Sequence, residues 1–595
     1  MSKTVLEHLR DHSRRRPDAV AYGEKVAGEW RTTTWLEYDR QVRSCARALL
    51  AQGIEPQQTV AILGGNKPEW SILCLAAMSI RAIAVGVYQT CSPEQVAYIV
   101  DHAEAPLILV EDGAQLAKIE AERERMPLLR TVVLMRPPSG AAGAESAGAL
   151  AWEEFLAGGE QVPEEVAETR FAEIEGGDIA SFIYTSGTTG YPKAVMISHQ
   201  NILDTGRIGN ALHGIEAGDT MVSYLPLAHV AEQMMSIHMP ASIGFAIYYA
   251  ESTDKLPQNL LEVQPSIFFA VPRVWERYFA AISDRLKSRQ PLARRVAAWA
   301  MKNGYQYSEA LNHGERPSPL LRLRFALADR LVLAKVRAAI GLRNLRIAAS
   351  GAAPITKEIL DFFAGLGVRV YEVYGLSETC GPGTWNRAGR TRLGTVGPPL
   401  PEVELRLEED GEVLFRGPNI FRGYFKDEKT TAEALDADGW LHTGDLGHLD
   451  ENGCLTITGR KKEILITSGG KNVAPAPIEN ALKELELVGD AVVIGDGRRF
   501  LTALIALEEE AAGRFARRHG LAGERQLHLE PGIVEELRRG IERVNQRFAR
   551  VENVRDFRLL PLRLSPDRGE LTPTLKLKRR VVADRYAALI EEMYG

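Results

Sequence analysis

Short apolar runs alternate with amphipathic helical segments from about residue 33 to residue 110. The segment LEYDRQVRSCARALLAQGI has the spacing of a helix with one apolar face, and TVAILG, AIAVGVY and PLILVE are each short enough to be one buried strand. Strands that alternate with helices are typical of a parallel sheet with helices on its faces. The alternation therefore predicts an α/β fold. It continues in four later apolar runs: DIASFIYTS, SIFFAV, LRIAASG and VRVYEVYG.

The last third of the chain has a different pattern. The segments EVELRLEEDGEVLFRG and GHLDENGCLTITGRKKEILIT alternate with period two around turn residues, which predicts antiparallel hairpins in a smaller β unit. A strand pair, DAVVIG and FLTALIAL, and several helical segments follow. With 595 residues, the chain is too long for one hydrophobic core. We therefore expect a large N-terminal domain, residues 1–460, with α/β subdomains and the small β unit, and a small α+β domain, residues 461–595.

Charge and cysteine content argue against several classes of function. Lys and Arg number 72 and Asp and Glu number 78, so the net charge is −6 and bulk nucleic-acid binding is not expected. The five cysteines are scattered and lack CxxC spacing, which indicates reduced thiols and not a disulfide framework or a zinc site. The N-terminus lacks the apolar core of a signal peptide, and the longest apolar region, ILCLAAMSIRAIAVGVY, is interrupted by Arg81. We therefore expect a cytoplasmic protein in which that region forms a buried helix and a strand.

Residues 285–346 form a strongly basic segment. They hold 14 Lys or Arg and three acids, Glu309, Glu315 and Asp329, and LLRLRFALADRLVLAKVRAAI has helical apolar spacing. One interpretation is a solvated helical insertion whose apolar stripe packs on the core. The other is a basic amphipathic surface that touches anionic lipid at the inner face of a membrane. The sequence leaves both open.

The segment YTSGTTGYPKAV, residues 184–195, combines glycines, hydroxyl residues and one lysine between two strand-like runs. Glycines let a backbone turn tightly with its N–H groups exposed, and Ser and Thr add hydroxyl donors. A concave set of donors beside a positive charge suits phosphate oxygens. The alternative is a flexible hairpin turn, and the Walker A pattern is not matched. The predicted phosphate-binding residues are Thr185, Ser186, Gly187, Thr188, Thr189, Gly190 and Lys193.

This segment resembles the phosphate loop of the adenylate-forming superfamily, which includes acyl-CoA synthetases, peptide-synthetase adenylation domains and luciferases. The resemblance implies a large domain, a small mobile C-terminal domain and two half-reactions. A carboxylate attacks the α-phosphate of ATP to give an acyl-adenylate and pyrophosphate, and a thiol then displaces AMP. Six further motifs of the superfamily follow in order: YLPLAHVAEQM, SGAAP, YGLSET, DGWLHTGD, GRKKEILITSGGKNVAP and LTPTLKLKRR.

The resemblance also implies roles for residues of SGAAP and YGLSET. Glu378 is expected to bind Mg²⁺ and Ser377 to contact the α-phosphate, since Mg²⁺ prefers hard oxygen ligands. Without the motif, Glu378 would be interpreted as a solvated surface charge and VRVYEVYG as core. The residues expected to contact the adenine are Gly351, Ala352, Ala353, Glu372, Tyr374 and Gly375.

Residues of the two following motifs are expected to contact the ribose and to permit domain rotation. By resemblance, Asp445 accepts hydrogen bonds from the ribose hydroxyls, and Arg460 contacts the ribose or a phosphate. Lys462 matches the hinge about which the small domain turns, with a solvated charge cluster as the alternative interpretation. Gly470 resembles the turn that lines the pantetheine path of CoA, where a residue without a side chain lets a thin ligand pass.

The resemblance predicts four catalytic residues: Thr185, His229, Glu378 and Lys576. Lys576 would neutralise charge on the carboxylate and the α-phosphate in the transition state. Leu575 stands where a glycine usually precedes this lysine, so Lys578 and a solvated basic tail remain alternatives. His229 would lie near the acyl pocket and position the substrate carboxylate, which is ionised near pH 7 and needs no general base.

The region from DGWLHTGD to GRKKEILIT resembles fatty acyl-CoA synthetases, and the basic helical segment is similar to long-chain members. The resulting prediction is a long-chain fatty acid:CoA ligase (AMP-forming) that acts on a fatty acid, ATP and CoA with Mg²⁺. One alternative is a fatty acyl-AMP ligase that loads an acyl carrier protein, but the extra segment of those relatives is not seen between HTGD and GRKKE. Another is a non-catalytic nucleotide or acyl-lipid binding module. The sequence leaves open whether the protein is a homodimer.

Overall fold

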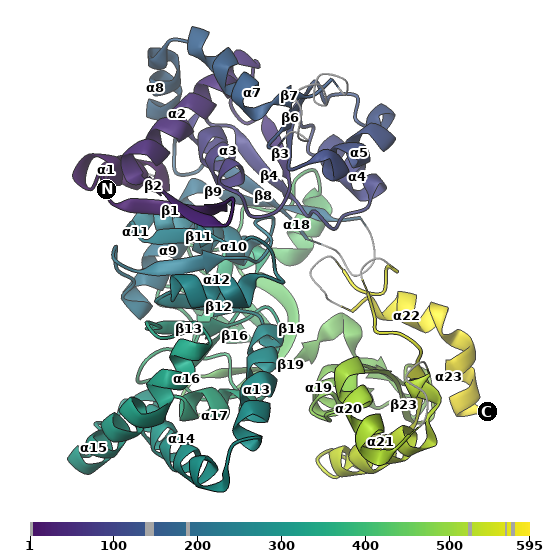
Figure 1. Cartoon of the computed structure of the whole chain (residues 1–595). Helices are drawn as coiled ribbons and strands as arrows, with labels where there is room; N and C mark the ends of the chain where they lie inside the picture. The colour runs from purple at the N-terminus through teal and green to yellow at the C-terminus, as the bar shows by residue number, and fades with distance from the viewer. Residues whose placement is uncertain (1–3, 137–147, 186–190, 522–525, 566–567, 573–576) are drawn as a thin grey trace. The chain divides into compact units, whose positions relative to one another are not determined.

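The computed structural model of this chain describes residues 4–136, 148–185, 191–521, 526–565, 568–572 and 577–595 (Figure 1). The chain divides into two compact units. The first unit comprises Met1–Arg406, Leu414–His442 and Asp450–Leu455, and the second comprises Leu407–Val413, Thr443–Leu449 and Thr456–Gly595. Because the chain passes between the units at several points within residues 406–456, the predicted boundary at residue 460 stays a prediction.

The α/β prediction is confirmed, beginning with a seven-stranded sheet in the first unit. Its strand order is β7-β6-β5-β3-β4-β8-β9, and all neighbours pair in parallel except β8 and β9, which form an antiparallel hairpin. Every residue of β3, β4 and β5 is buried, as expected of continuous apolar runs in a parallel sheet. The strands are β3 (Thr59–Leu63), β4 (Ile83–Val87), β5 (Leu107–Val110), β6 (Thr131–Leu134), β7 (Leu150–Ala151), β8 (Ile179–Thr185) and β9 (Lys193–Ser198).

The apolar region around Arg81 is a buried helix followed by a strand, as predicted. Eleven of the 12 residues of α3 (Pro68–Ser79) are buried, and Arg81 turns the chain into β4 while its guanidinium pairs with Asp178 at 3.0 Å. Within the described residues, no helix has the length and apolar character to cross a membrane. Other helices of the N-terminal part are α1 (Val5–Arg15), α2 (Trp35–Ala51), α4 (Pro93–His102), α5 (Gly113–Ala121), α7 (Trp152–Gly158) and α8 (Glu164–Ala172).

The second sheet of the first unit has eight strands in the order β15-β14-β13-β12-β10-β11-β1-β2. Its inner strands are parallel, and the antiparallel strands β2 and β15 form the two edges. Strands β13 and β14 come from LRIAASG and VRVYEVYG and pair in parallel. SGAAP and YGLSET therefore begin in the last residues of two neighbouring strands, at the carboxyl ends where open α/β sheets bind ligands. The strands are β1 (Val20–Val26), β2 (Glu29–Thr34), β10 (Thr220–Ser223), β11 (Ala246–Tyr249), β12 (Ile267–Ala270), β13 (Ile347–Ser350), β14 (Val370–Leu376) and β15 (Gly381–Trp385).

The basic segment 285–346 is largely helical. It contains α14 (Pro291–Asn312), α15 (Pro319–Ala328), the π-helical turn η4 (Asp329–Leu333) and α16 (Ala334–Ala339). In Figure 1, α14 and α15 lie side by side below the eight-stranded sheet, and α14 packs on α17 (Lys357–Gly365). Five residues of the segment belong to the buried core there: Ala300, Ala328, Leu333, Ile340 and Leu342. Others, such as Phe325 and Val336, are partly buried against it. The apolar stripe therefore packs on the core only in part.

The first unit contains further helices. They are α9 (His199–His213), α10 (Val230–Gln233), the π-helical turn η3 (Met234–His238), α11 (Met239–Ile243), α12 (Leu256–Val263), α13 (Pro272–Lys287) and α18 (Glu428–Ala434).

The second unit is built on a three-stranded sheet. Strands β22 (Val488–Ile494) and β23 (Leu501–Leu507) pair antiparallel, as the two apolar runs predict, and β24 (Val554–Leu560) pairs parallel with β23. Its helices are α19 (Pro475–Lys483), α20 (Glu509–His519), α21 (Pro531–Asn545), α22 (Arg579–Arg585) and α23 (Ala587–Tyr594). The chain changes unit within each of four strands: β16 (Glu404–Leu407), β17 (Glu412–Arg416), β18 (Leu441–Leu449) and β19 (Leu455–Arg460).

Candidate active site

The predicted phosphate loop connects β8 and β9. Ser186, Gly187, Thr188, Thr189 and Gly190 lie outside the described residues, so the structure describes only the two ends of this loop. Thr185 at the end of β8 is paired with Lys193 at the start of β9.

Lys193 points to a third segment. Its ammonium group donates to the hydroxyl of Thr430 at 3.2 Å and lies 5.4 Å from the centre of the Tyr424 ring. An ammonium group at that distance from an aromatic face is weakly attracted to it. The lysine is thus held beside Tyr424 and close to the end of the loop.

Glu378 meets the same tyrosine from another strand. It lies in the short turn η5 (Ser377–Thr379) directly after β14, and the hydroxyl of Tyr424 donates to its Oε1 at 2.8 Å. Burial and the neighbouring Glu378 raise the pKa of Tyr424, so its phenol stays protonated and remains a donor. The fold therefore brings Lys193 and Glu378, from two separate motifs, to one aromatic side chain. Tyr424 was not among the residues predicted from the sequence.

The turn that carries Ser377 and Glu378 is fixed by hydrogen bonds to Thr379. The hydroxyl of Thr379 accepts from the backbone N–H of Leu376 at 2.9 Å and donates to the carbonyl of Gly381 at 2.6 Å. Ser377 and Glu378 themselves stay partly exposed. Within the described part of the chain, no three His, Cys, Asp or Glu side chains are grouped so that they alone could hold a metal ion. Glu378 suits the usual way in which proteins bind Mg²⁺, which is through one or two carboxylates together with substrate phosphates.

The predicted adenine wall gathers at the ends of β13 and β14. Ser350 pairs with Glu372 across the two strands, so Gly351, Ala352 and Ala353 follow directly beside β14. Ala352 has φ 67°, a left-handed backbone that is strained for a residue with a Cβ atom. Such strain is found more often at functional sites than elsewhere.

Glu372 is a buried carboxyl group, only 6% exposed. Its Oε2 accepts the N–H of Gly394 at 2.9 Å, but burial outweighs this bond and raises the pKa of Glu372 to about 8. At neutral pH the group is therefore mostly uncharged and can donate as well as accept a hydrogen bond.

Tyr374 and Gly375 follow on the same strand. Tyr374 is half-buried and Gly375 is exposed. A Cβ atom on Gly375 would lie 1.8 Å from the carbonyl oxygen of Gly381 on β15. This glycine is thus required by the pairing of β14 and β15, whatever it contacts in a ligand.

His229 lies in the segment between β10 and α10. Its Nδ1 accepts the N–H of Ala231 at 3.3 Å, so the neutral ring carries its proton on Nε2. This segment packs next to Glu232, a fully buried carboxyl group that was not among the residues predicted from the sequence. Oε1 of Glu232 accepts from Ser223 and Ser236 at 2.7 Å each and from the N–H of Tyr224 at 3.2 Å. Burial raises the pKa of Glu232 to about 7.

The second unit holds another group of predicted residues. Nε of Arg460, at the end of β19, pairs with Oδ1 of Asp445 on β18 at 3.1 Å. Lys462 is exposed in the turn η6 (Lys461–Glu463) that follows. Gly470 has φ 71° in the hairpin turn after β20 (Leu465–Ile466), and a Cβ atom there would meet nothing within 4 Å. Lys576 lies outside the described residues, and its competitor Lys578 directly precedes α22 without capping it through its side chain.

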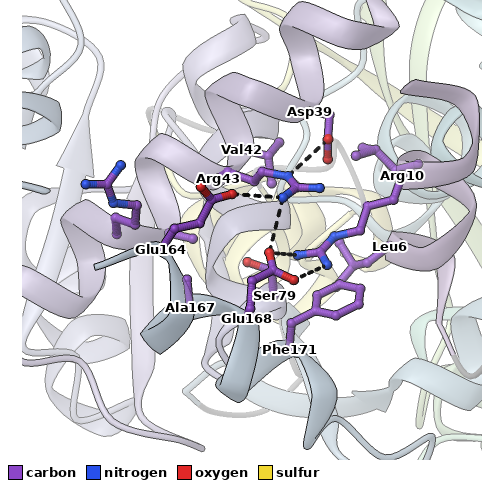
Figure 2. Close-up of a pocket in the computed structure, with 13 residues that line it drawn as sticks. Leu6, Arg10, Asp39, Val42, Arg43, Ser79, Glu164, Ala167, Glu168 and Phe171 are labelled. Atoms are coloured by element: carbon purple, nitrogen blue, oxygen red, sulfur yellow. Dashed lines mark hydrogen bonds and ion pairs between the residues drawn. The ribbon is translucent and has the colours of Figure 1, made fainter. Parts of the chain in front are cut away.

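None of these residues lines the cavity of the first unit that Figure 2 shows. It is lined mainly by side chains from α1, α2 and α8, and Figure 2 shows Arg10 and Arg43 pointing toward carboxylates. Arg10 pairs with Glu168 at 2.8 Å, and Arg43 pairs with Asp39 at 3.1 Å. With a volume of about 20 Å³, the cavity has room for a water molecule and not for a nucleotide. Its charges are satisfied within the fold, so they tie helices together and form no anion site.

Comparison with known proteins identifies the family of this chain. A model described as AMP-binding enzyme matches residues 9–425, and a model described as AMP-binding enzyme C-terminal domain matches residues 462–595. The chain belongs to the AMP-binding enzyme family. The superfamily resemblance of its motifs is thereby confirmed.

Relatives of this AMP-binding enzyme match almost its whole length. The long-chain-fatty-acid–CoA ligase FadD15 of Mycobacterium bovis is 36% identical over 599 residues, which cover 99% of this chain and 96% of the relative. The long-chain-fatty-acid–CoA ligase ACSBG2 of Xenopus laevis is 34% identical over 609 residues, which cover 97% of this chain and 82% of the relative. The crystal structure of the anthranilate CoA ligase AuaEII in complex with anthranoyl-AMP has a TM-score of 0.73 at 19% identity, covering 99% of this chain and 100% of that one. That likeness shows a shared fold.

Proposed function

We propose that this AMP-binding enzyme is a long-chain fatty acid:CoA ligase (AMP-forming). A carboxylate oxygen of the acid attacks the α-phosphorus of ATP, the bond from that phosphorus to the bridging oxygen breaks, and pyrophosphate leaves. The sulfur of CoA then attacks the acyl carbonyl carbon, the thiol proton is released, and AMP leaves. The observation that carries the proposal is the meeting of Lys193 and Glu378 at Tyr424, since a cation and a carboxylate are what a magnesium–triphosphate requires.

At the phosphate end of ATP, Lys193 and the hydroxyl and N–H groups of the loop from Thr185 to Gly190 would bind phosphate oxygens. Ser377 would contact the α-phosphate. Glu378 would hold Mg²⁺, which offsets phosphate charge when it is bound. Tyr424 fixes the Glu378 carboxylate through one oxygen.

At the purine end, the segments after β13 and β14 would enclose the adenine. Gly351, Ala352 and Ala353 would form one wall and Tyr374 with Gly375 the other. An uncharged Glu372 suits this position, because the edge of the adenine presents both hydrogen-bond donors and acceptors. A neutral carboxyl group can pair with either kind.

In the second unit, Asp445 and Arg460 would bind the ribose, and their ion pair orients the carboxylate that accepts the hydroxyls. We infer that residues 461–595 turn about Lys462 between the half-reactions. Lys576 would neutralise charge during adenylation, and the open space above Gly470 would let the pantetheine arm of CoA pass close to the backbone.

The acid itself would be held mainly by burial of its chain, at about 0.8 kcal/mol per CH₂. His229 would donate from Nε2 to the substrate carboxylate and so position it for attack. The substrate class is supported by the names of relatives that match nearly the full chain, and the same names give no support to a carrier-protein ligase.

The proposal is tested by measuring AMP release with ATP, Mg²⁺ and CoA over fatty acids from short to very long. We expect a CoA-dependent maximum at long chains. If acyl-adenylate accumulates without thioester at every acyl chain length, the acceptor is a carrier protein and not CoA. No pyrophosphate exchange into ATP with any acid would reject ligase activity.

A further inference from the structure

The exposed apolar side chains of this protein concentrate in the helical insertion. Of 17 large apolar side chains that are exposed among the described residues, seven lie between residues 292 and 331. Scattered exposed leucines are ordinary, whereas a concentration of them marks a surface that contacts something apolar. The seven are Leu292, Val296, Trp299, Leu320, Leu323, Leu327 and Leu331.

Four of these side chains share one side of α15 and the turn after it. Leu320, Leu323, Leu327 and Leu331 follow one another at intervals of three, four and four residues, which is the spacing of one helix face. We call them the leucine face. Leu323 is 69% exposed and Leu320 56% exposed, whereas Ala328 and Leu333 of the same segment are buried in the core. The helix therefore already buries one apolar side and shows a second one to the outside.

Positive charge flanks the leucine face. Arg322, Arg324, Arg330 and Lys335 are exposed around it. The single acid of this stretch, Asp329, pairs with Arg337 at 2.7 Å. In the described part of the chain, no carboxylate lies within 4 Å of Arg324, Arg330 or Lys335, so their charge is free to act on a partner.

We propose that the leucine face docks on the surface of an anionic membrane, with the leucines at the boundary of headgroups and acyl chains and the arginines on the headgroups. Exposed leucines next to cations are the combination that binds an interfacial helix to anionic lipid. No described helix could cross the bilayer, so the contact is peripheral. The contact would let the enzyme take its substrate from the membrane, in which a long-chain acid dissolves. This purpose rests on the proposed function.

A second copy of the chain is a poorer occupant of this face. In a two-fold dimer the same patch meets itself, so Arg324 and Arg330 of one copy would face the same arginines of the other. Like charges brought together at a desolvated contact repel, whereas lipid phosphates complement them.

The test is co-sedimentation of the whole protein, without ATP, with phosphatidylcholine vesicles that do or do not contain phosphatidylglycerol. We expect binding to the anionic vesicles that weakens with salt. The double variant Leu323→Ser/Leu327→Ser should bind at least roughly ten-fold less well, because two leucines no longer enter the lipid. The variant Arg324→Glu/Arg330→Glu should lose the preference for phosphatidylglycerol.

The matched control is Leu529→Ser, which removes another exposed leucine, 63% exposed, in the second unit and should bind as the unaltered protein does. Equal vesicle binding by the unaltered protein and by both double variants would overturn the docking proposal. The proposal would also be overturned if the unaltered protein forms a dimer and the substitutions Leu323→Ser/Leu327→Ser dissociate that dimer. In the Leu323→Ser/Leu327→Ser variant, ligase activity with an acid supplied in water-soluble form should be unchanged. Its ligase activity with the acid inside anionic vesicles should fall. Vesicle binding by a protein that activates no acid would reject the proposed function and leave the docking face standing.

Discussion

The hydroxyl of Tyr424 lies 2.8 Å from Oε1 of Glu378 and donates a hydrogen bond to it. The ring of the same tyrosine lies 5.4 Å from Nζ of Lys193. One side chain thus sets the spacing between the carboxylate and the cation that we assign to the metal and the phosphates of ATP.

The first prediction concerns that carboxylate. Glu378→Gln should lower kcat/KM for ATP by about 100-fold, because a neutral amide neither binds Mg²⁺ well nor complements its charge. Tyr424→Phe keeps the carboxylate and loses one hydrogen bond, so it should cost about ten-fold or less. Pyrophosphate exchange measured over a series of Mg²⁺ concentrations checks both variants. A half-saturating Mg²⁺ concentration that is the same in Glu378→Gln and in the unaltered enzyme would remove Glu378 from the metal site.

The second prediction concerns the buried carboxyl group of Glu372. Its pKa is about 8 in the folded protein and 4.5 ordinarily, so between these values only the folded state keeps the proton. The stability that this group contributes is fully present below about pH 4.5 and is lost as the pH rises to about 8, by up to about 1.4 kcal/mol per pH unit.

Glu372→Gln cannot ionise and should escape this loss. The melting temperature of the variant minus that of the unaltered protein should therefore grow as the pH is raised from about 5 to about 8. A difference that stays constant over this range would mean that Glu372 is already ionised in the fold.

The third prediction concerns Gly375. In Gly375→Ala the new Cβ atom would lie 1.8 Å from the carbonyl oxygen of Gly381, so β14 and β15 must separate. Overpacking of this kind costs about 1–3 kcal/mol, and the displaced strand should also raise KM for ATP. Gly113→Ala is the control, because a Cβ atom at Gly113 meets nothing within 4 Å. Equal melting temperatures for the two variants would contradict the expected clash.

The fourth prediction concerns Lys576. Lys576→Ala should slow acyl-adenylate formation by about 100-fold or more and spare thioester formation from a preformed acyl-adenylate, because its charge acts on the first transition state. Lys578→Ala should leave both half-reactions close to normal. Single-turnover assays of each half-reaction separate these outcomes. An equal fall in both half-reactions for Lys576→Ala would make that lysine a structural residue.

The fifth prediction concerns Glu232, the buried carboxyl group close to His229 in the sequence. Glu232→Ala leaves the buried donors Ser223, Ser236 and the N–H of Tyr224 without their acceptor, so it should lower the free energy of unfolding by about 3 kcal/mol or more. Ser236→Ala removes one donor and leaves the others paired, so about 1 kcal/mol is expected. Urea denaturation monitored by tryptophan fluorescence compares the two. A smaller effect for Glu232→Ala than for Ser236→Ala would show that the carboxyl group is not the hub of this network.

The sequence by itself determined the class of fold and the motifs. Strands such as β4 and β5 are readable because a buried strand in a parallel sheet is apolar throughout, and helix α3 is readable because Arg81 ends its apolar run. Motif residues such as Glu378 and Asp445 were found by resemblance alone, because single polar residues in loops carry no periodicity.

The tertiary structure decided which of these groups meet. Tyr424 belongs to no motif that we recognised, and only the fold brings it to Glu378 and Lys193. Glu232 looks like any helical glutamate until β10 and η3 surround it with donors, and Gly375 looks like a turn glycine until β15 passes it. The spacing of the leucine face is likewise the same for a packed helix as for an exposed one. Periodicity tells which side chains share a face, and only the packing of distant segments decides whether protein covers that face.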